Sequence, residues 1–451
     1  MGHQTIRHPG KRNTRLGFTL LTLIGVLCTA GLRAADLRLS LKEAVDMALS
    51  EEGNTAVQVA KEMIQEFQAR SRQSRAPLLP NLEGSVSEQS QVRNLEAFGL
   101  QPSGLFRPPD KVGPFAIFDA RATLTQTIIN LGAWRRYQAS KVAVTAAQTE
   151  KTSTEDRTAA QVARTYLTAL RNQARLDTAA ANVELAEALL ELAQNQKDAG
   201  TGTGIEITRA QVQLSNQRHL QLAARQQYSQ AVLTLLQQIG ANLNDNLLLT
   251  ESLEYQPVEV TSVSQALALA LQSRSDLQVQ RHKEEEADLG YRATRMDRMP
   301  SLAGIADYGA IGNRANDSFS TWSVAVSLRL PLFDGGRQRA HQAETQSRLH
   351  QQQIHTQDLQ QQIELEIRLS LDGLQVAEQQ IQSSQEGLGL AEQELAQAER
   401  RYRAGITNSV EVTDAQTRLE RARENHIEAL FNHSFQRINL GEAMGTIRSM
   451  L

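Results

Sequence analysis

Two acidic residues, Glu411 and Asp414, lie three positions apart shortly after a glycine, Gly405. Residues three apart share one face of a helix, so both carboxylates would project together from a helix that begins after a turn at the glycine. A solvated helix face is the plainest interpretation of any single acid. This pair is notable because it follows the predicted turn at Gly405, and the segment around that turn has a second copy elsewhere in the chain.

Other residue patterns do not indicate catalysis or a bound cofactor. Histidine pairs such as His350 with His355 have neither dense ligand spacing nor nearby carboxylate clusters, so we expect no metal site. The pair Gly335-Gly336 lacks the surroundings of a phosphate-binding loop and is better interpreted as a bend between a strand and a helix. No nucleophile motif is present, and the formal charge of -3 gives no basic field for nucleic acid. We therefore predict that the protein is not an enzyme.

Two segments about 205 residues apart are versions of each other: under this shift Gly200 falls on Gly405, and Glu206 falls on Glu411. Before each glycine, large side chains recur every seven residues, with a small side chain three positions after each. The large residues are Leu176, Val183 and Leu190, then Ile381, Leu388, Leu395 and Tyr402. The small ones are Ala179, Ala186 and Ala193, then Ser384, Ala391 and Ala398. Such a seam lets long helices interlock, as in coiled coils.

Each half of the chain is predicted to run helix, strand pair, very long helix, tight turn, helix. The proline-free stretch before Gly200 would make a helix of roughly 100 Å. Single helices are expected from Leu39 to about Ser74 and over 263–298. The first predicted repeat is 36–240, with strands at about 81–93 and 116–129 and a hairpin at about 131–240. An equatorial connector follows at 241–260. The second predicted repeat is 261–451, with strands at about 301–311 and 320–332 and a hairpin at about 335–443.

Residues 1–35 have the order of an export signal: basic residues, an apolar run from Leu16 to about Ala30, then small residues. The exact cleavage site stays open. Cys28 is the only cysteine, and the residues before it are not small as a lipidation site requires, so we do not expect lipidation. No later stretch has the roughly 18 uncharged apolar residues of a spanning helix.

The segment around Trp322 carries a membrane signal in its alternation. Trp322, Val324, Val326 and Leu328 are large and apolar, while the residues between them are small or polar. This pattern is typical of a transmembrane barrel strand with one face toward lipid, although a half-buried strand in a soluble sandwich would show it too. Four strands cannot close a barrel, because about eight is the practical minimum. A spanning role therefore requires an oligomer.

Motifs that flank these elements resemble the outer-membrane efflux protein family, whose archetype is TolC. They occur in order along nearly all of the chain: Leu79-Pro80-Asn81-Leu82, Met299-Pro300-Ser301-Leu302, Leu330-Pro331-Leu332-Phe333-Asp334-Gly335-Gly336, Tyr402-Arg403-Ala404-Gly405 and Val410-Glu411-Val412-Thr413-Asp414-Ala415-Gln416. The resemblance implies a mainly α protein with a transmembrane β-barrel. Three copies would form a 12-stranded barrel in outer-membrane lipid, continuing into a 12-helix periplasmic α-barrel. A periplasmic adaptor and an inner-membrane pump are the implied partners.

The resemblance also implies roles for residues at the tips. Family members carry acids at the positions of Glu411 and Asp414, where the acids form rings that narrow the closed periplasmic mouth. Three copies would bring six carboxylates around one axis, which favours cations and raises the cost of closure. The tip glycines Gly200 and Gly405 would turn the chain where adaptors engage.

Further tip residues match closed-state contacts of the family. Glu206 and Tyr402 are at positions that take part in those contacts. The archetype has an arginine where this chain has Thr407, so a charged latch to Glu206 cannot form in the same way. Arg209 and Arg403 are the candidates to replace that arginine.

Two alternatives from other classes remain at this stage. A periplasmic coiled-coil adaptor also has long helical hairpins, but one of its hairpins would be interrupted by a lipoyl or barrel module. A soluble structural coiled coil would explain the heptads but not the strand at Trp322 or the export signal. The sequence does not say which cargo is exported or which class of pump and adaptor takes part.

Overall fold

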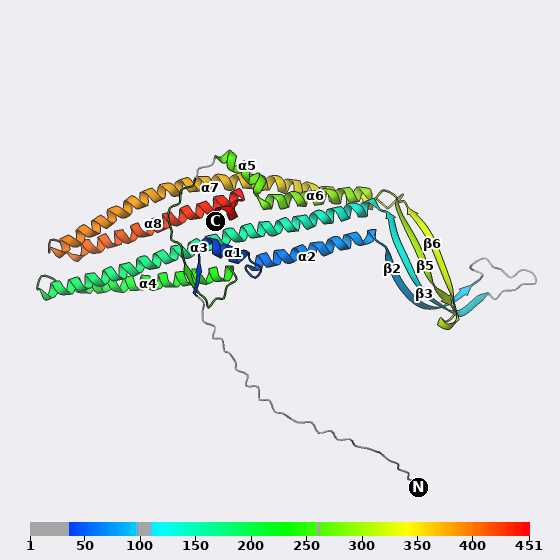
Figure 1. Cartoon of the computed structure of the whole chain (residues 1–451), viewed down its shortest axis with the longest axis horizontal. Helices are drawn as coiled ribbons and strands as arrows, with labels where there is room; N and C mark the ends of the chain where they lie inside the picture. Colours follow the sequence, from blue (N-terminus) through cyan, green and yellow to red (C-terminus); the bar gives the residue numbers. More distant parts are fainter. Residues whose placement is uncertain (1–35, 96, 98–109, 259–261) are drawn as a thin grey trace, which may run out of the picture.

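The computed structural model describes residues 36–95, 97, 110–258 and 262–451. The predicted export signal, with Cys28 and its cleavage site, lies outside these residues. A long bundle of helices leads at one end into a curved sheet, and two helical hairpins form the other end (Figure 1). Within the described part, no helix is both long and apolar enough to cross a membrane.

The helices and strands follow one another in nearly the same order in both halves of the chain. The helices are α1 Leu41–Leu49, α2 Thr55–Arg75, α3 Leu131–Asp198, α4 Gly204–Gln238, α5 Val263–Ser273, α6 Ser275–Met296, α7 Arg337–Arg403, α8 Ser409–Met444 and α9 Ile447–Met450. The strands are β1 Asp36–Leu39, β2 Asn81–Asn94, β3 Lys111–Ile129, β4 Asn246–Leu249, β5 Ser301–Gly312 and β6 Ser318–Arg329. Short 3-10 turns lie at Ala76–Leu78 and Ala315–Asp317.

Helices α3 and α7, of 68 and 67 residues, are the two long members of the bundle. Along α3, α4 packs on one half and α2 on the other, while α8 and α6 divide α7 in the same way (Figure 1). Two shorter helices placed end to end therefore accompany each long one.

The predicted single helix from Leu39 to Ser74 is wrong, because the chain breaks between α1 and α2. Gly53 passes so close to α1 that an added Cβ would lie 2.3 Å from the Met47 carbonyl oxygen. Asn54 then caps α2: its side-chain oxygen accepts from the N–H of Ala56 at 2.9 Å, and its amide donates to the Gln238 carbonyl at 2.8 Å. A tight local turn at Gly53, supported by the long-range bond from Asn54 to Gln238, thus separates α1 from α2.

The predicted single helix at 263–298 is also two helices. Arg274 between α5 and α6 has extended backbone, with φ -65° and ψ 115°. Its guanidinium bridges Asp276 on α6 and Glu366 on α7. The break lets α5 leave the direction of α6 while the arginine ties both to the long helix.

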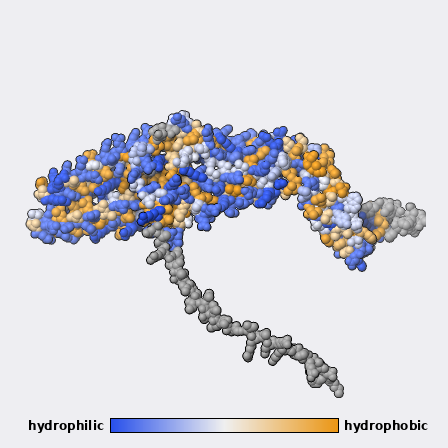
Figure 2. Space-filling view, in the orientation of Figure 1, coloured by the Kyte–Doolittle hydropathy of each residue, from blue (hydrophilic) through white to orange (hydrophobic). Residues whose placement is uncertain are grey.

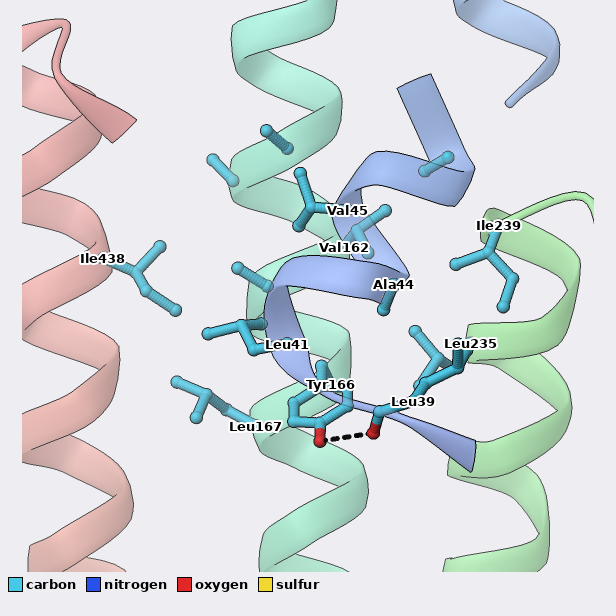
Figure 3. Packing of buried hydrophobic residues seen from close by; sticks show 14 of the residues in the cluster. Leu39, Leu41, Ala44, Val45, Val162, Tyr166, Leu167, Leu235, Ile239 and Ile438 are labelled. Carbon is cyan, nitrogen blue, oxygen red and sulfur yellow. Dashed lines mark hydrogen bonds between the residues drawn. The ribbon is translucent and has the colours of Figure 1, made fainter. Parts of the chain in front are cut away.

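A small apolar core holds the two halves together near the middle of the bundle. Strands β1 and β4 pair in parallel there, although no strand was predicted at either place: the predicted helix began at Leu39, the last residue of β1, and β4 lies in the predicted connector. The Tyr166 hydroxyl of α3 donates to the Leu39 carbonyl at 2.9 Å (Figure 3), and burial raises the pKa of this tyrosine to about 12. Around it pack Leu41, Val162 and Leu235. This contact fixes the start of the described chain against α3.

The remaining strands form one antiparallel sheet in the order β2-β3-β5-β6. The pairing register places Trp322 opposite Tyr308, and Val326 opposite Gly304. Residues opposite each other share a face, so one face is largely apolar. Its large exposed members are Leu82, Val86, Leu124, Tyr308, Trp322, Val324, Val326 and Leu328. Figure 2 shows hydrophobic residues gathered over the sheet where it leaves the helices.

The other face of the same sheet carries charged and hydroxyl groups. Arg121 on β3 bridges Asp119, at 2.5 Å, and Asp307 on β5, at 3.5 Å. Ser323 on β6 donates to Asp307 from the next strand. A polar network therefore crosses three strands on the side opposite the apolar row.

Candidate functional site at the hairpin tips

Both hairpins turn through the same backbone motif. At the second tip the N–H of Gly405 donates to the Tyr402 carbonyl, and that of Ile406 to the Arg401 carbonyl, both at 3.0 Å. These two bonds close a helix end of the Schellman type, which needs a residue with positive φ. Gly405 has φ +69°, and Gly200 at the first tip has φ +75° with the equivalent pair of bonds. The repeat thus extends to individual hydrogen bonds.

The first tip begins its returning helix with a capping box. The side chain of Glu206 accepts from the backbone N–H of Thr203 at 3.0 Å and from its hydroxyl at 3.2 Å. These bonds are the glutamate side of a capping box, which gives a partner to a backbone N–H at the helix end that would otherwise have none. The Glu206 carboxylate is therefore held at the start of its own helix.

The second tip caps the equivalent helix in another way. Asn408 accepts from the N–H of Val410 at 3.0 Å through its own side chain. The Glu411 carboxylate is therefore not part of a capping box. It instead accepts from the Thr407 hydroxyl and forms an ion pair with Arg401 across the turn, at 3.2 Å.

Asp414 is also paired with an arginine. Arg418, one turn further along α8, contacts both Asp414 and Glu394, which lies on α7. The arginine thus joins the two helices of the hairpin and a carboxylate on each. The structure brings Glu411 and Asp414 onto the first two turns of one helix, where their spacing placed them.

Tyr402 is buried beneath the second tip, with 3% of its surface exposed. Its hydroxyl has no hydrogen-bond partner among the described residues, and it lines a small cavity together with Glu206 and Arg209. Burial raises the pKa of Tyr402, and the negative charge of Glu206 raises it further. Gln196 donates to the Tyr402 carbonyl at 3.2 Å. The cavity therefore lies where the two hairpins meet.

An apolar core supports this meeting point. Five of the seven residues that the heptad seam singled out in the second copy lie in this core, with further residues from α8 and leucines from α3 of the first hairpin. The members are Leu388, Ala391, Leu395, Ala398, Tyr402, Val412, Ala415, Leu419, Leu185, Leu189 and Leu192. Interlocked packing thus holds the acids on firm helices.

A family model described as outer membrane efflux protein matches residues 47–241 and 266–446, which is most of the chain. The chain belongs to the outer membrane efflux protein family. Its relatives include the probable efflux pump outer membrane protein SepC and the toluene efflux pump outer membrane protein TtgF, both of Pseudomonas putida. Each is 23% identical over 391 residues, covering 85% of this chain and 78% of the relative. The alkaline protease secretion protein AprF of Pseudomonas aeruginosa is 26% identical over 234 residues, covering 49% of both proteins.

Solved structures share the fold. The channel CusC superposes with a TM-score of 0.77 at 18% identity, covering 93% of this chain and 95% of the other. The CmeC outer membrane channel of Campylobacter jejuni gives 0.76 at 16% identity, covering 90% and 86%. Family membership confirms the predicted localisation in a Gram-negative outer membrane with a periplasmic extension. It also confirms a non-enzymatic transport protein and disfavours the adaptor alternative.

The two arginines named from sequence as candidates to replace the family's gate arginine differ in their surroundings. Arg403 pairs with Glu399, four residues earlier on the same helix, at 3.3 Å. Arg209 borders the cavity at Glu206. The arginine that contacts Glu411 is Arg401, which sequence reasoning missed because it lies across the turn.

Arg418 was also missed, although its signal was present. It follows Asp414 by four residues, and oppositely charged residues at that spacing are neighbours on a helix. Its second contact, with Glu394, joins two helices and has no such local signature.

At the far end of the molecule, the row predicted to face lipid is exposed along β6. Trp322, Val324, Val326 and Leu328 have 67–72% of their surface accessible in the single chain. Large apolar side chains exposed together mark a surface that meets another apolar phase or partner.

Proposed function

We propose that the protein is the outer-membrane channel of a tripartite efflux or type I secretion system, a passive duct from the periplasm to the exterior. The observation that carries this function is the pair of contrasting sheet faces, joined to two long helical hairpins. Its relatives named as efflux pump proteins and as a protease secretion protein support both kinds of system. The cargo is left open.

The proposed assembly is a homotrimer embedded in outer-membrane lipid. One chain contributes four strands, and a barrel needs about eight. Strands β2 and β6 are the outer strands of the sheet, so each can pair with the opposite edge of another copy. Three copies would give 12 strands with the Arg121 network facing the lumen. The duplicated hairpins would continue as a 12-helix α-barrel.

The repeats define the parts of this assembly. We propose residues 36–240 and 261–451 as the two repeats, 241–260 as the connector at the equator, and 1–35 as a cleaved export signal. The connector then lies beside the β1–β4 core, where the halves are joined. Adaptor docking would occur at the end of the bundle away from the sheet, around Gly200 and Gly405.

Glu411 and Asp414 are the proposed constriction, with Glu206, Tyr402 and Thr407 lining the contacts that hold the mouth closed. Support comes from their convergence: both acids begin α8, and Glu206 and Tyr402 line the same cavity between the hairpins. Docking of the adaptor and pump would separate the hairpins and open this end.

The lipid face is tested by two neighbouring substitutions. Val326→Arg should cost about 2–4 kcal/mol and impair insertion, because it places a charge on the apolar face, whereas Ser327→Arg on the opposite face should be tolerated. Heat-stable trimer in outer-membrane fractions is the measurement. Equal tolerance at both positions would overturn the assignment of faces.

The oligomer is tested with cysteines on the two edge strands. The chain has one natural cysteine, in the expected signal, so engineered thiols give a clean readout. Ser85→Cys on β2, combined with Ser323→Cys or Ser327→Cys on β6, should give cross-linked species that stop at three subunits. The single variants serve as controls. A detergent-free soluble monomer that carries the full chain would refute the barrel.

A further inference from the structure

The two acids proposed to narrow the mouth are each partnered by a guanidinium group of their own hairpin. Arg401 forms an ion pair with Glu411, and the Thr407 hydroxyl donates to the same carboxylate. Arg418 contacts Asp414 and Glu394 together. At this tip, two arginines therefore stand beside three carboxylates.

These ion pairs do little for stability. The side chains of Arg401 and Glu411 are 55% and 40% exposed, and those of Arg418 and Asp414 are 54% and 57% exposed. Exposed pairs contribute little because water screens them and the side chains lose freedom. The apolar core under the tip already holds α7 against α8. The arginines therefore matter mainly for the electrostatic potential that ions meet at the tip.

We propose that Arg401 and Arg418 determine the ion specificity of the periplasmic mouth by compensating the charge of Glu411 and Asp414. This inference rests on the proposed constriction at those acids. A bare ring of carboxylates would hold multivalent cations and repel anionic cargo. With a guanidinium group beside each acid, the mouth attracts cations weakly and admits anionic as well as neutral solutes.

The first tip shows what the compensation adds. Glu206, at the position equivalent to Glu411, is bonded to Thr203 in its capping box. The capping box gives hydrogen bonds to one carboxylate oxygen of Glu206 but leaves the negative charge in place. At the second tip the same position faces a cation, so charge as well as hydrogen bonding is balanced there.

The test uses trimers in planar bilayers, with two readouts: the reversal potential in a potassium chloride gradient and the lanthanum(III) concentration that half-blocks the current from the periplasmic side. Arg401→Gln and Arg418→Gln should each raise the preference for potassium over chloride. Each should tighten lanthanum block by about tenfold, because a trivalent ion feels the loss of a nearby positive charge three times over. The double variant should exceed either single variant.

Two controls separate the mouth from general surface charge. Arg218→Gln removes the same charge from an exposed ion pair with Glu187, at 2.7 Å, on the first hairpin, and it should leave both readouts unchanged. Arg401→Lys and Arg418→Lys keep the charge and should behave like the natural protein. Effects of Arg218→Gln equal to those of Arg401→Gln would overturn the proposal.

Variants of the two acids distinguish a failure of the charge compensation from a failure of the proposed constriction. If Glu411→Ala with Asp414→Ala alters selectivity while both arginine variants do not, compensation is refuted and the constriction stands. If neither the acid variant nor the arginine variants change either readout, the constriction is elsewhere and the compensation falls with it. Shifts in both sets of variants, in opposite directions, are the expected result.

Discussion

The two hairpin tips have the same backbone and different chemistry. Gly200 and Gly405 end their helices with the same pair of hydrogen bonds and nearly the same positive φ. Glu206 and Glu411 then occupy the same position in the returning helix, yet the first is bonded within a capping box and the second to an arginine across the turn. Duplication therefore conserved the turn and left the charge free to change.

A single residue accounts for much of this difference. Thr203 offers a hydroxyl to Glu206, whereas its counterpart Asn408 bonds the N–H of Val410 through its own side chain. The acid at the second tip is thereby released from capping and reaches Arg401. The comparison suggests that the first tip is built for helix stability and the second for control of ions.

The largest expected effect separates the acids of the two tips. Glu411→Ala with Asp414→Ala should weaken cation preference in planar bilayers and weaken block by a trivalent cation by about two orders of magnitude, because charges on all three copies disappear. Glu206→Ala should loosen the proposed closed-state contacts and raise conductance, but it should change ion preference and trivalent block much less than the double variant does. The cost of Glu206→Ala should be about 1 kcal/mol of local helix stability, from the lost capping box.

Unchanged block in a correctly assembled double variant would place the constriction elsewhere. A large loss of selectivity in Glu206→Ala would instead make the first tip part of the ion path. Either result would contradict the assignment of ion selectivity to the second tip.

The next largest expected effect concerns the glycine with positive φ that both tips share. Gly405→Val and Gly200→Val should each cost about 1–2 kcal/mol locally, because both positions have positive φ, which L-residues resist. An added Cβ would meet no atom within 4 Å at either glycine, so the expected cost comes from the backbone conformation. We expect export to fall because the tips are the proposed site of adaptor docking. Trimer levels in the outer membrane should stay unchanged.

Gly204 supplies the control for these variants. It also has open space around an added Cβ, and its φ is not positive, so Gly204→Ala should leave export unchanged. Normal export by Gly405→Val would argue against docking at the second tip. A difference between the two valine variants would show which tip the adaptor needs more, because their backbone costs are alike.

The long helices and turns could be predicted because their signals are local and repeated. The seam of large and small residues and the glycine at each turn fall within single segments, and the duplication confirms the pattern. The β1–β4 pair was missed because four-residue strands about 210 residues apart carry no periodicity of their own. The break at Gly53 was missed because its tight turn against Met47 has no periodic signal, and because the contact of Asn54 with Gln238 that supports it is tertiary.

The candidate site was predictable in part. The family motif located Glu411 and Asp414, and the i to i+4 spacing could have located Arg418. Arg401 reaches Glu411 only once the turn has brought its two sides together. Charge partners across a turn depend on side-chain directions, which neither spacing nor composition determines.

The smallest expected effect exchanges the caps of the two tips. Asn408→Thr would place a threonine three residues before Glu411, the spacing of a capping box, and should draw the carboxylate from Arg401 toward the helix start. Because the negative charge stays while its nearby cation is released, cation preference should shift only a few-fold, measured as reversal potential.

The reciprocal change, Thr203→Asn, should release Glu206 from its box and cost no more than about 1 kcal/mol, because asparagine is also a good cap. Selectivity in this variant should stay unchanged, since no ion pair of the second tip is touched. If Asn408→Thr leaves the Arg401–Glu411 pair intact in a structure of the variant, the cap does not decide where Glu411 points. The difference between the tips would then lie in Arg401 itself, because the equivalent position in the first repeat is Gln196, which has no charge to offer.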